Sequence, residues 1–145
     1  MPEDGSADPD APAPVPASDK NLTGILASIL DPMADDLPAY QPTDLTDTVM
    51  YESFTFLPYE EGYHAASADA LIGAIAHSVV LVEVPDGADA DAVAEQLAAK
   101  ANPRKWICVE AESVQVAVKG QLVLLVMSDT ATADAIIAAF NALSL

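Results

Sequence analysis

The sequence predicts a small layered α+β domain, in which a mixed or antiparallel sheet of three to four strands is packed against helices. Segments with the two-residue period of strands and the 3.6-residue period of helices alternate from residue 77 onward, in the order β-α-β-β-β-α. One of these strands, 122–127, is apolar on both faces, as expected of a central strand. With 145 residues the chain has room for one domain.

A leader rich in proline, aspartate and alanine precedes that domain. Residues 1–20 contain five of the eleven prolines and five acids, and their only sizeable apolar side chains are Met1 and Val15. Such a segment cannot bury enough apolar surface to offset its ordering entropy, about 1–2 kcal/mol per residue for the backbone. We therefore expect residues 1–20 to be a disordered, solvated spacer and residues 21–145 to form a single α+β domain.

The next sixty residues predict helices joined by loops. A first helix is expected over 22–30, where apolar residues have helical spacing, with Ser18 or Asp19 as its cap. Asp31-Pro32 ends that helix, because a residue before proline avoids the helical region. After an acidic, proline-containing loop, a short helix is expected over 43–50.

Two later segments are less distinctive in pattern. Residues 51–57 fit either a strand, with Phe54 and Phe56 on one face, or a loop over the core. Residues 67–76 predict a short helix with Ser67 as its cap.

The second half of the chain has clearer boundaries. The elements expected there are a strand over 77–84, a helix over 89–101, strands over 105–109, 113–118 and 122–127, and a helix over 130–143. Lys119-Gly120 predicts a two-residue hairpin turn. The first crossover can pair its strands in parallel. If helices cover one face of the sheet only, the N-terminal helix or a second copy of the chain must cover the other, so a homodimer is one expectation.

The charge of the chain restricts its partners. Five basic and 23 acidic residues give a net charge of −18, and up to Ala99 the only base is Lys20. This surface repels phosphate backbones and anionic lipid headgroups, so we expect no nucleic-acid partner and no direct membrane binding.

The residue types that build metal sites are scarce. Cys108 is the single cysteine, which excludes a disulfide and a thiolate metal site within the chain and predicts a small buried apolar side chain. Two histidines cannot form a three-histidine zinc site. The acids of 86–91 lack the residue order of a calcium loop and are expected to form a turn and cap a helix. We expect no metal and no cofactor.

Three segments together carry a resemblance to a known family. They are Ile-Ala-His-Ser-Val-Val-Leu-Val at 75–82, Pro-Asp-Gly-Ala-Asp at 85–89 and Asn-Pro-Arg-Lys-Trp-Ile-Cys-Val at 102–109. The chain from Leu45 to Leu143 resembles a family of domains of unknown function found in predicted envelope lipoproteins of gut Gram-positive bacteria. The resemblance implies no activity and no catalytic residues. It implies an extracellular, membrane-anchored lipoprotein in which the leader is the spacer after a lipidated cysteine that this chain lacks.

The densest group of chemically active side chains is the segment 59–64. Its candidate binding residues are Tyr59, Glu60, Glu61, Tyr63 and His64. Carboxylates beside a histidine and tyrosines suit general acid–base chemistry, metal binding or ligand recognition, but the spacing matches no catalytic motif. An exposed acidic loop with one aromatic side chain anchored in the core is the alternative.

A second candidate binding patch is Arg104, Lys105 and Trp106, the one place where bases and an aromatic residue adjoin. It suits recognition of an anionic ligand or docking of an acidic surface. Alternatively, Trp106 packs in the core and the two bases pair with acids such as Glu110 and Glu112. His77 is expected to form a hydrogen bond at the end of the sheet, or else to share a proton-transfer role with His64.

These observations favour a non-enzymatic extracellular binding module tethered to the cell envelope, with an unknown protein or envelope ligand as its partner. The alternative is a small hydrolase-type enzyme that uses the segment Tyr59–His64, with Arg104 or Lys105 holding an anion. No catalytic residue is assigned from the sequence.

Overall fold

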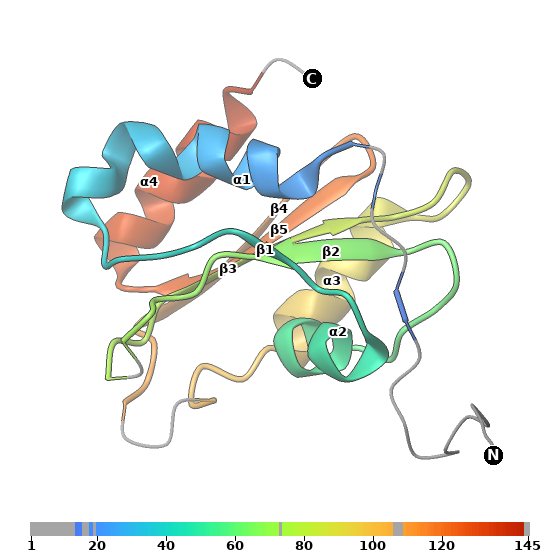
Figure 1. The fold of residues 1–145 in the computed structure, drawn as a ribbon, viewed down its shortest axis with the longest axis horizontal. Helices are drawn as coiled ribbons and strands as arrows, with labels where there is room; N and C mark the ends of the chain where they lie inside the picture. Colours follow the sequence, from blue (N-terminus) through green and yellow to red (C-terminus); the bar gives the residue numbers. More distant parts are fainter. Residues whose placement is uncertain (1–13, 16–17, 19, 73, 106–108, 144–145) are drawn as a thin grey trace, which may run out of the picture.

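A five-stranded antiparallel sheet forms the middle layer of the molecule (Figure 1). The computed structural model describes residues 14–15, 18, 20–72, 74–105 and 109–143. The strands are β1 Thr43–Asp44, β2 His64–Ser67, β3 Ser78–Glu83, β4 Ser113–Lys119 and β5 Leu122–Ser128. Their order across the sheet is β1-β2-β3-β5-β4, and all neighbours are antiparallel. The predicted α+β class is confirmed, with five strands in place of three or four.

Helices cover both faces of this sheet. The α-helices are α1 Leu22–Leu30, α2 Thr48–Thr55, α3 Ala90–Lys100 and α4 Thr130–Asn141, and a 3₁₀ helix, Asp31–Asp36, follows α1. Helices α1 and α4 lie on one face, and α2 and α3 lie on the other (Figure 1). The N-terminal helix therefore helps to cover the second face, which was one of the two alternatives expected from the sequence.

The core consists of two apolar layers on either side of β3 and β5. Val79 and Leu81 pack toward α1 and α4, whereas Val80 and Val82 pack toward α2 and α3, and all four are fully buried. Because every position of β5 is also buried, the prediction of a doubly apolar central strand is confirmed.

The crossover through α3 differs from the expectation. Strands β3 and β4 both pair antiparallel with β5, so they run in the same direction, but β5 lies between them. The predicted parallel pair does not form. Strand β5, which lies between them, is the most apolar of these three strands and is covered by helices on both faces. Strand β4 lies at the edge of the sheet and is only half-buried.

Three predicted helices are confirmed within a few residues. Asp89 and Asp129 cap α3 and α4 by accepting the N–H groups of Ala92 and Thr132. The cap of α1 was predicted wrongly: Asn21 accepts the Gly24 N–H at 3.3 Å. Ser18 is engaged elsewhere, and Asp19 lies outside the described residues.

The short helix predicted over 43–50 lies several residues later in the chain. Helix α2 begins after Asp47, whose side chain accepts the Met50 N–H at 2.8 Å, and it continues to Thr55. Neither a strand nor a loop occupies most of 51–57. The helix ends where Phe56 adopts the left-handed conformation (φ 62°), which lets the chain reverse before β2.

The helix predicted over 67–76 is absent. Ser67 ends β2, and the Ala68 N–H extends the pairing by donating to the Val79 carbonyl at 2.8 Å. Ala66 and Ala68 are fully buried in the core layer that includes α1. The first residues of the predicted helix, Ser67 and Ala68, are thus part of the sheet pairing, because tertiary packing overrides local preference.

The expected strand over 105–109 and the expected position of the hairpin turn also differ from the structure. Lys105 and Val109 belong to the irregular connection between α3 and β4, and the rest of the strand predicted over 105–109 lies outside the described residues. The hairpin turn is Gly120-Gln121, one residue later than predicted, and Lys119 pairs with Leu122. Gly120 has a φ of 61°, which glycine adopts without strain.

Part of the predicted spacer contacts the domain. Of residues 1–20, the structure describes Pro14, Val15, Ser18 and Lys20. The Val15 side chain is 5% exposed in the core layer on the α2–α3 face, and its N–H donates to the Thr46 carbonyl at 2.9 Å. The packed part of the chain therefore includes residues before 21. None of the described helices is long and apolar enough to span a bilayer.

Candidate functional site

The segment Tyr59–His64 lies between α2 and β2 and spreads its side chains over several places. The Tyr59 ring packs edge-on against Tyr51, with ring centroids 5.1 Å apart. Glu60 and Glu61 are exposed on the turn, and His64 is half-buried at the start of β2.

The carboxylate and imidazole groups of this segment line different hollows. Glu60 and Tyr63 line a hollow of about 430 Å³ beside α3. His64 lines another, of about 310 Å³, with Glu83. His77 lies at the opposite end of β3 from Glu83, which pairs with His64, so roughly 20 Å separates the two histidines. The hypothesis of a shared proton-transfer role for His64 and His77 is wrong.

The second predicted patch is also divided. The Arg104 side chain is 77% exposed and lies 3.8 Å from the Glu110 carboxylate, which is the pairing expected for a solvated base. Lys105 points inward instead, and Trp106 lies outside the described residues. Glu112, the other expected acidic partner, accepts the Thr130 N–H at 2.8 Å.

Lys105 belongs to a polar cluster at the start of β3. Its ammonium donates to Asp69 at 2.8 Å and to the Ser78 hydroxyl at 3.4 Å. Ser78 in turn donates to the other Asp69 oxygen at 2.6 Å, and the ammonium lies 4.7 Å from the centroid of the Phe54 ring. This cluster connects the β2–β3 loop, strand β3, helix α2 and the connection before β4.

On the opposite face of the sheet, His77 occupies the neighbouring position. Its side chain is 1% exposed, and Nδ1 lies 2.8 Å from the Ser128 hydroxyl at the end of β5. Nε2 is buried, and within the described part of the chain it has no hydrogen-bond partner. Burial lowers the pKa of His77, while the Asp69 and Asp129 carboxylates act in the opposite direction.

His77 and Ser128 line a hollow of about 370 Å³ between the β2–β3 loop, the connection before β4 and the start of α4. Three acids share this lining: Glu110, Glu112 and Asp129. A hydrogen bond from the Thr130 backbone N–H lowers the pKa of Glu112, and hydrogen bonds from the Thr132 side chain and backbone N–H lower that of Asp129. Both carboxyl groups are therefore charged at neutral pH.

The β2–β3 loop beside this hollow exposes large apolar side chains. Leu71 is 64% exposed, Ile72 is 56% exposed and Ile75 is 38% exposed. Figure 1 places the β2–β3 loop at the left-hand lower edge of the view. Exposed apolar side chains gathered in one place are typical of contact surfaces.

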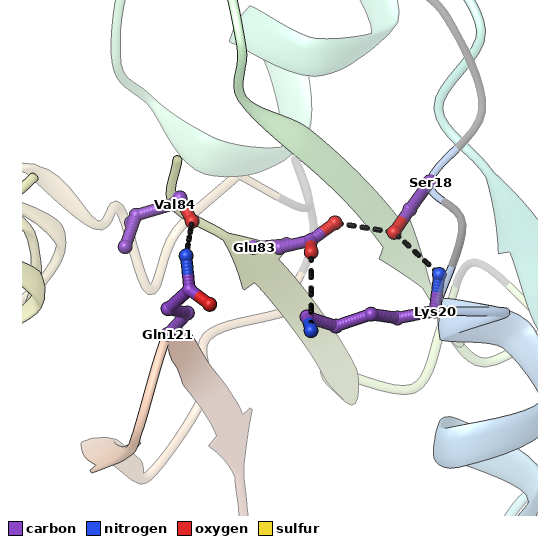
Figure 2. Close-up of polar contacts among 5 residues, drawn as sticks. All are labelled: Ser18, Lys20, Glu83, Val84 and Gln121. Atoms are coloured by element: carbon purple, nitrogen blue, oxygen red, sulfur yellow. Dashed lines mark hydrogen bonds and ion pairs between the residues drawn. The ribbon is translucent and has the colours of Figure 1, made fainter. Parts of the chain in front are cut away.

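The other end of β3 holds a polar cluster of a different kind (Figure 2). The Glu83 carboxylate accepts a hydrogen bond from the Ser18 hydroxyl and lies 3.8 Å from the Lys20 ammonium. Gln121 in the β4–β5 turn donates to the Val84 carbonyl at 3.1 Å. These contacts fasten the segment before α1 to the end of the sheet and present no converging reactive groups.

Metal-ligating side chains are scattered over the described residues. No group of three or more histidine, cysteine, aspartate or glutamate residues among them is placed to hold a metal ion. Ser78 and Ser128 are 1% and 3% exposed, so neither hydroxyl faces solvent as a nucleophile would. The described residues do form an acidic hollow lined by the buried His77, next to the exposed apolar side chains of the β2–β3 loop.

Lys105 was predicted from the sequence as a candidate binding residue, whereas Asp69, Ser78 and Ser128 were not. A signal was present, because polar residues stand directly before β3 and after β5. These residues can be recognised as neighbours only when the pairing of β3 with β5 is known, because that pairing brings the start of β3 beside the end of β5.

Comparison with models of protein families, with curated proteins and with solved structures finds no match to this chain.

Proposed function

We propose that the chain is a non-enzymatic binding module on the outer side of the cell envelope, and that it docks onto a partner protein through the β2–β3 loop. The observation that carries the proposal is the exposure of Leu71, Ile72 and Ile75 within five residues. The described residues expose one further large apolar side chain, Val49 of α2, at 55%. Burying the three loop side chains against a partner removes them from water, which favours association.

Two backbone positions at the start of the loop are held in place before any partner arrives. The Leu71 N–H donates to the Ala39 carbonyl at 2.8 Å, and the Ala70 N–H donates to the His77 carbonyl at 3.0 Å. Backbone that is already hydrogen-bonded loses less conformational entropy on binding, so more of the apolar contact contributes to affinity.

Charge indicates what kind of partner surface fits. The chain carries a net charge of −18, and Glu110 and Glu112 are exposed on the connection that borders the hollow next to Ile75. The complementary surface is an apolar depression bordered by lysine or arginine. Such charges accelerate association at low ionic strength and disfavour acidic competitors.

The location at the envelope is supported by the resemblance to envelope lipoprotein domains and by the polar leader. In this proposal the leader connects the domain to a lipid anchor, so the membrane is reached only through that anchor. Within the domain, the apolar loop then faces the extracellular space.

The geometry supports the alternative, a hydrolase that uses the segment Tyr59–His64, less well than it supports a binding module. Glu60 and His64 line separate hollows. Lys105, one of the two bases assigned to hold an anion, already contacts Asp69.

Site-specific photo-crosslinking tests the docking surface. A benzophenone amino acid replaces Ile72 in the full chain, expressed in the producing organism, and a matched variant carries it at Val49, which is equally exposed on α2. We expect a discrete protein adduct from position 72 that is absent from position 49 and that weakens several-fold as the ionic strength is raised.

Three other crosslinking outcomes would contradict the proposed docking surface or its partner. Equal labelling from both positions rules out the loop as a specific surface. Adducts of twice the mass of the chain indicate self-association, and lipid adducts indicate insertion into a membrane. In either case the partner-protein proposal is wrong.

A further inference from the structure

Strand β4 leaves the sheet with an open edge. It is the last strand in the order β1-β2-β3-β5-β4, and within the described residues it pairs with β5 only. Every position of Ser113–Lys119 is half-buried, although apolar side chains of this strand belong to the core layers on both faces of the sheet. The exposed part of β4 is therefore its outer edge.

The register of the sheet determines which backbone groups lie at that edge. The Val84 N–H donates to the Gln121 carbonyl at 2.9 Å, in line with the pairing of β3 with β5. Because backbone groups along an antiparallel strand point to alternate sides, the odd-numbered residues of β5 bond to β3 and the even-numbered residues bond to β4. Their partners in β4 are Ser113, Gln115, Ala117 and Lys119. The other three residues of β4 direct their N–H and C=O groups outward: Val114, Val116 and Val118.

Strand β4 has none of the features that usually protect a sheet edge. Its register with β5 is continuous from Ser113 to Lys119, so it has no bulge; it contains no proline, and its only charge is at its last residue. The other edge strand, β1, has two residues, includes Asp44 and follows Pro42. Short strands, prolines, bulges and charges prevent edges from pairing with another chain, so β1 is protected and β4 is not.

The open edge is complementary to a second copy of itself. In an antiparallel pair centred on Val116, that residue faces its counterpart, and Val114 faces Val118 of the second copy. Each of these pairs can exchange two N–H···O=C bonds, and a shift of the register by two residues loses one pair. The same arrangement places the Lys119 end of each strand beside the end that follows Glu112 in the other copy. A parallel arrangement would instead bring ends of like charge together.

We propose that the chain forms a homodimer in which the β4 strands of two copies pair antiparallel about a two-fold axis at Val116. The two sheets then become one continuous sheet, and the interface is isologous, as two-fold symmetry requires. This interface uses a different surface from Leu71, Ile72 and Ile75, so the proposal does not rest on the partner-protein contact proposed above.

Sedimentation velocity over a range of protein concentrations tests the association. We expect the mass to double from that of the 15.0 kDa chain as the concentration rises. Because each copy has a net charge of −18, a higher ionic strength should favour the dimer, whereas it should weaken the partner contact at Ile72. A monomer at every concentration and ionic strength overturns the proposal and leaves the photo-crosslinking outcome unaffected.

Amide hydrogen exchange followed by NMR tests which surface forms the dimer. We expect the N–H groups of Val114, Val116 and Val118 to exchange about tenfold or more slowly in the dimer than in the monomer, because only the dimer gives them acceptors. The N–H groups of Gln115 and Ala117 bond to β5 in both states and serve as the internal control. A dimer in which the three valine amides exchange as fast as in the monomer uses another surface and contradicts the proposal.

Val116→Pro and Val116→Ala form a matched pair of variants. Proline removes an N–H that the pairing of β4 with β5 does not use and places its ring at the two-fold axis, so it should weaken the dimer about tenfold or more. Alanine also shortens the side chain but keeps the N–H, so it should weaken the dimer much less. Circular dichroism checks that both variants fold.

Equal weakening of the dimer by the two variants would exclude backbone pairing at Val116. If the proline variant does not fold, the exchange rates of the valine amides in the unmodified chain still decide between this edge and another surface.

Discussion

Lys105 shows how strongly the environment of one residue changes its role. In the sequence it stands beside Arg104 in a basic patch, but in the structure the two side chains are 17% and 77% exposed. The partly buried ammonium is held by Asp69 and Ser78 and joins segments that are far apart in the chain. An ion pair removed from water in this way is costly to break, because the remaining carboxylate has lost its hydration.

We predict that Lys105→Met lowers the free energy of unfolding by about 2–3 kcal/mol, somewhat less than for a fully buried pair. Arg104→Met, the matched control, should cost less than about 0.5 kcal/mol, because both partners of its ion pair are mostly exposed. Urea unfolding monitored by circular dichroism measures both. Equal losses for the two variants would show that Lys105 contributes no more than a surface charge.

His77 should make stability depend on pH in a defined window. Burial lowers its pKa from the ordinary 6.5 in the folded state. Above pH 6.5 both states hold a neutral ring. As the pH falls below 6.5, the unfolded chain binds a proton that the folded chain resists, so the free energy of unfolding declines until the lowered pKa is passed.

We therefore expect stability to fall as the pH drops below 6.5, above the range in which Asp129 and Glu112 take up protons. His77→Gln should remove this decline, whereas His64→Gln should retain it. Denaturant titrations at several pH values provide the measurement, and an unchanged slope in His77→Gln would exclude His77 as the cause.

Among the elements, α1 begins in a way that depends on a single contact. Asn21 is left-handed (φ 53°), and its side chain caps the helix by accepting the Gly24 N–H. A Cβ at Gly24 would lie 2.4 Å from Nδ2 of Asn21. The glycine therefore leaves room for the cap, although alanine at that position favours the helix by about 1 kcal/mol in general.

We predict that Gly24→Ala alone changes stability little, since the gain in helix propensity is offset by displacement of the Asn21 side chain. In an Asn21→Gly background, where that side chain is absent and the left-handed φ is unstrained, Gly24→Ala should stabilise by about 1 kcal/mol. A double-mutant cycle of thermal unfolding measures the difference. Equal effects in both backgrounds would contradict the proposed interference.

The β2–β3 region shows where propensity fails at the scale of elements. Residues 67–76 are rich in alanine, which indicates a helix, yet Ser67 ends strand β2 and the buried Ala68 continues its pairing with β3. Alanine fits there because a small side chain lets α1 approach β2 closely. The need for a small side chain is set by the neighbouring helix α1, so the local sequence pattern does not reveal it.

At the scale of the whole molecule, each face of the sheet is covered by helices of the same chain. The homodimer expected from the sequence stays a prediction. The N-terminal segment adds to the cover on the α2–α3 face through Val15.

We predict that Val15→Ala lowers the free energy of unfolding by about 1–2 kcal/mol, because it removes buried apolar surface from the core. Val49→Ala is the matched control at a 55% exposed position and should cost less than about 0.5 kcal/mol. If both variants are equally stable, residues before 21 are a solvated spacer throughout.

The sequence by itself determined the α+β class, the doubly apolar central strand β5, and a helix cap among the acids of 86–91, which is Asp89 of α3. These features follow from local periodicity and from side chains that bond to the backbone three residues away. Only the tertiary structure decided that β5 lies between β3 and β4, that Lys105 is internal, and that His77 adjoins Ser128 beneath an acidic hollow. Each of these depends on contacts between segments distant in sequence, and local patterns do not specify such pairings.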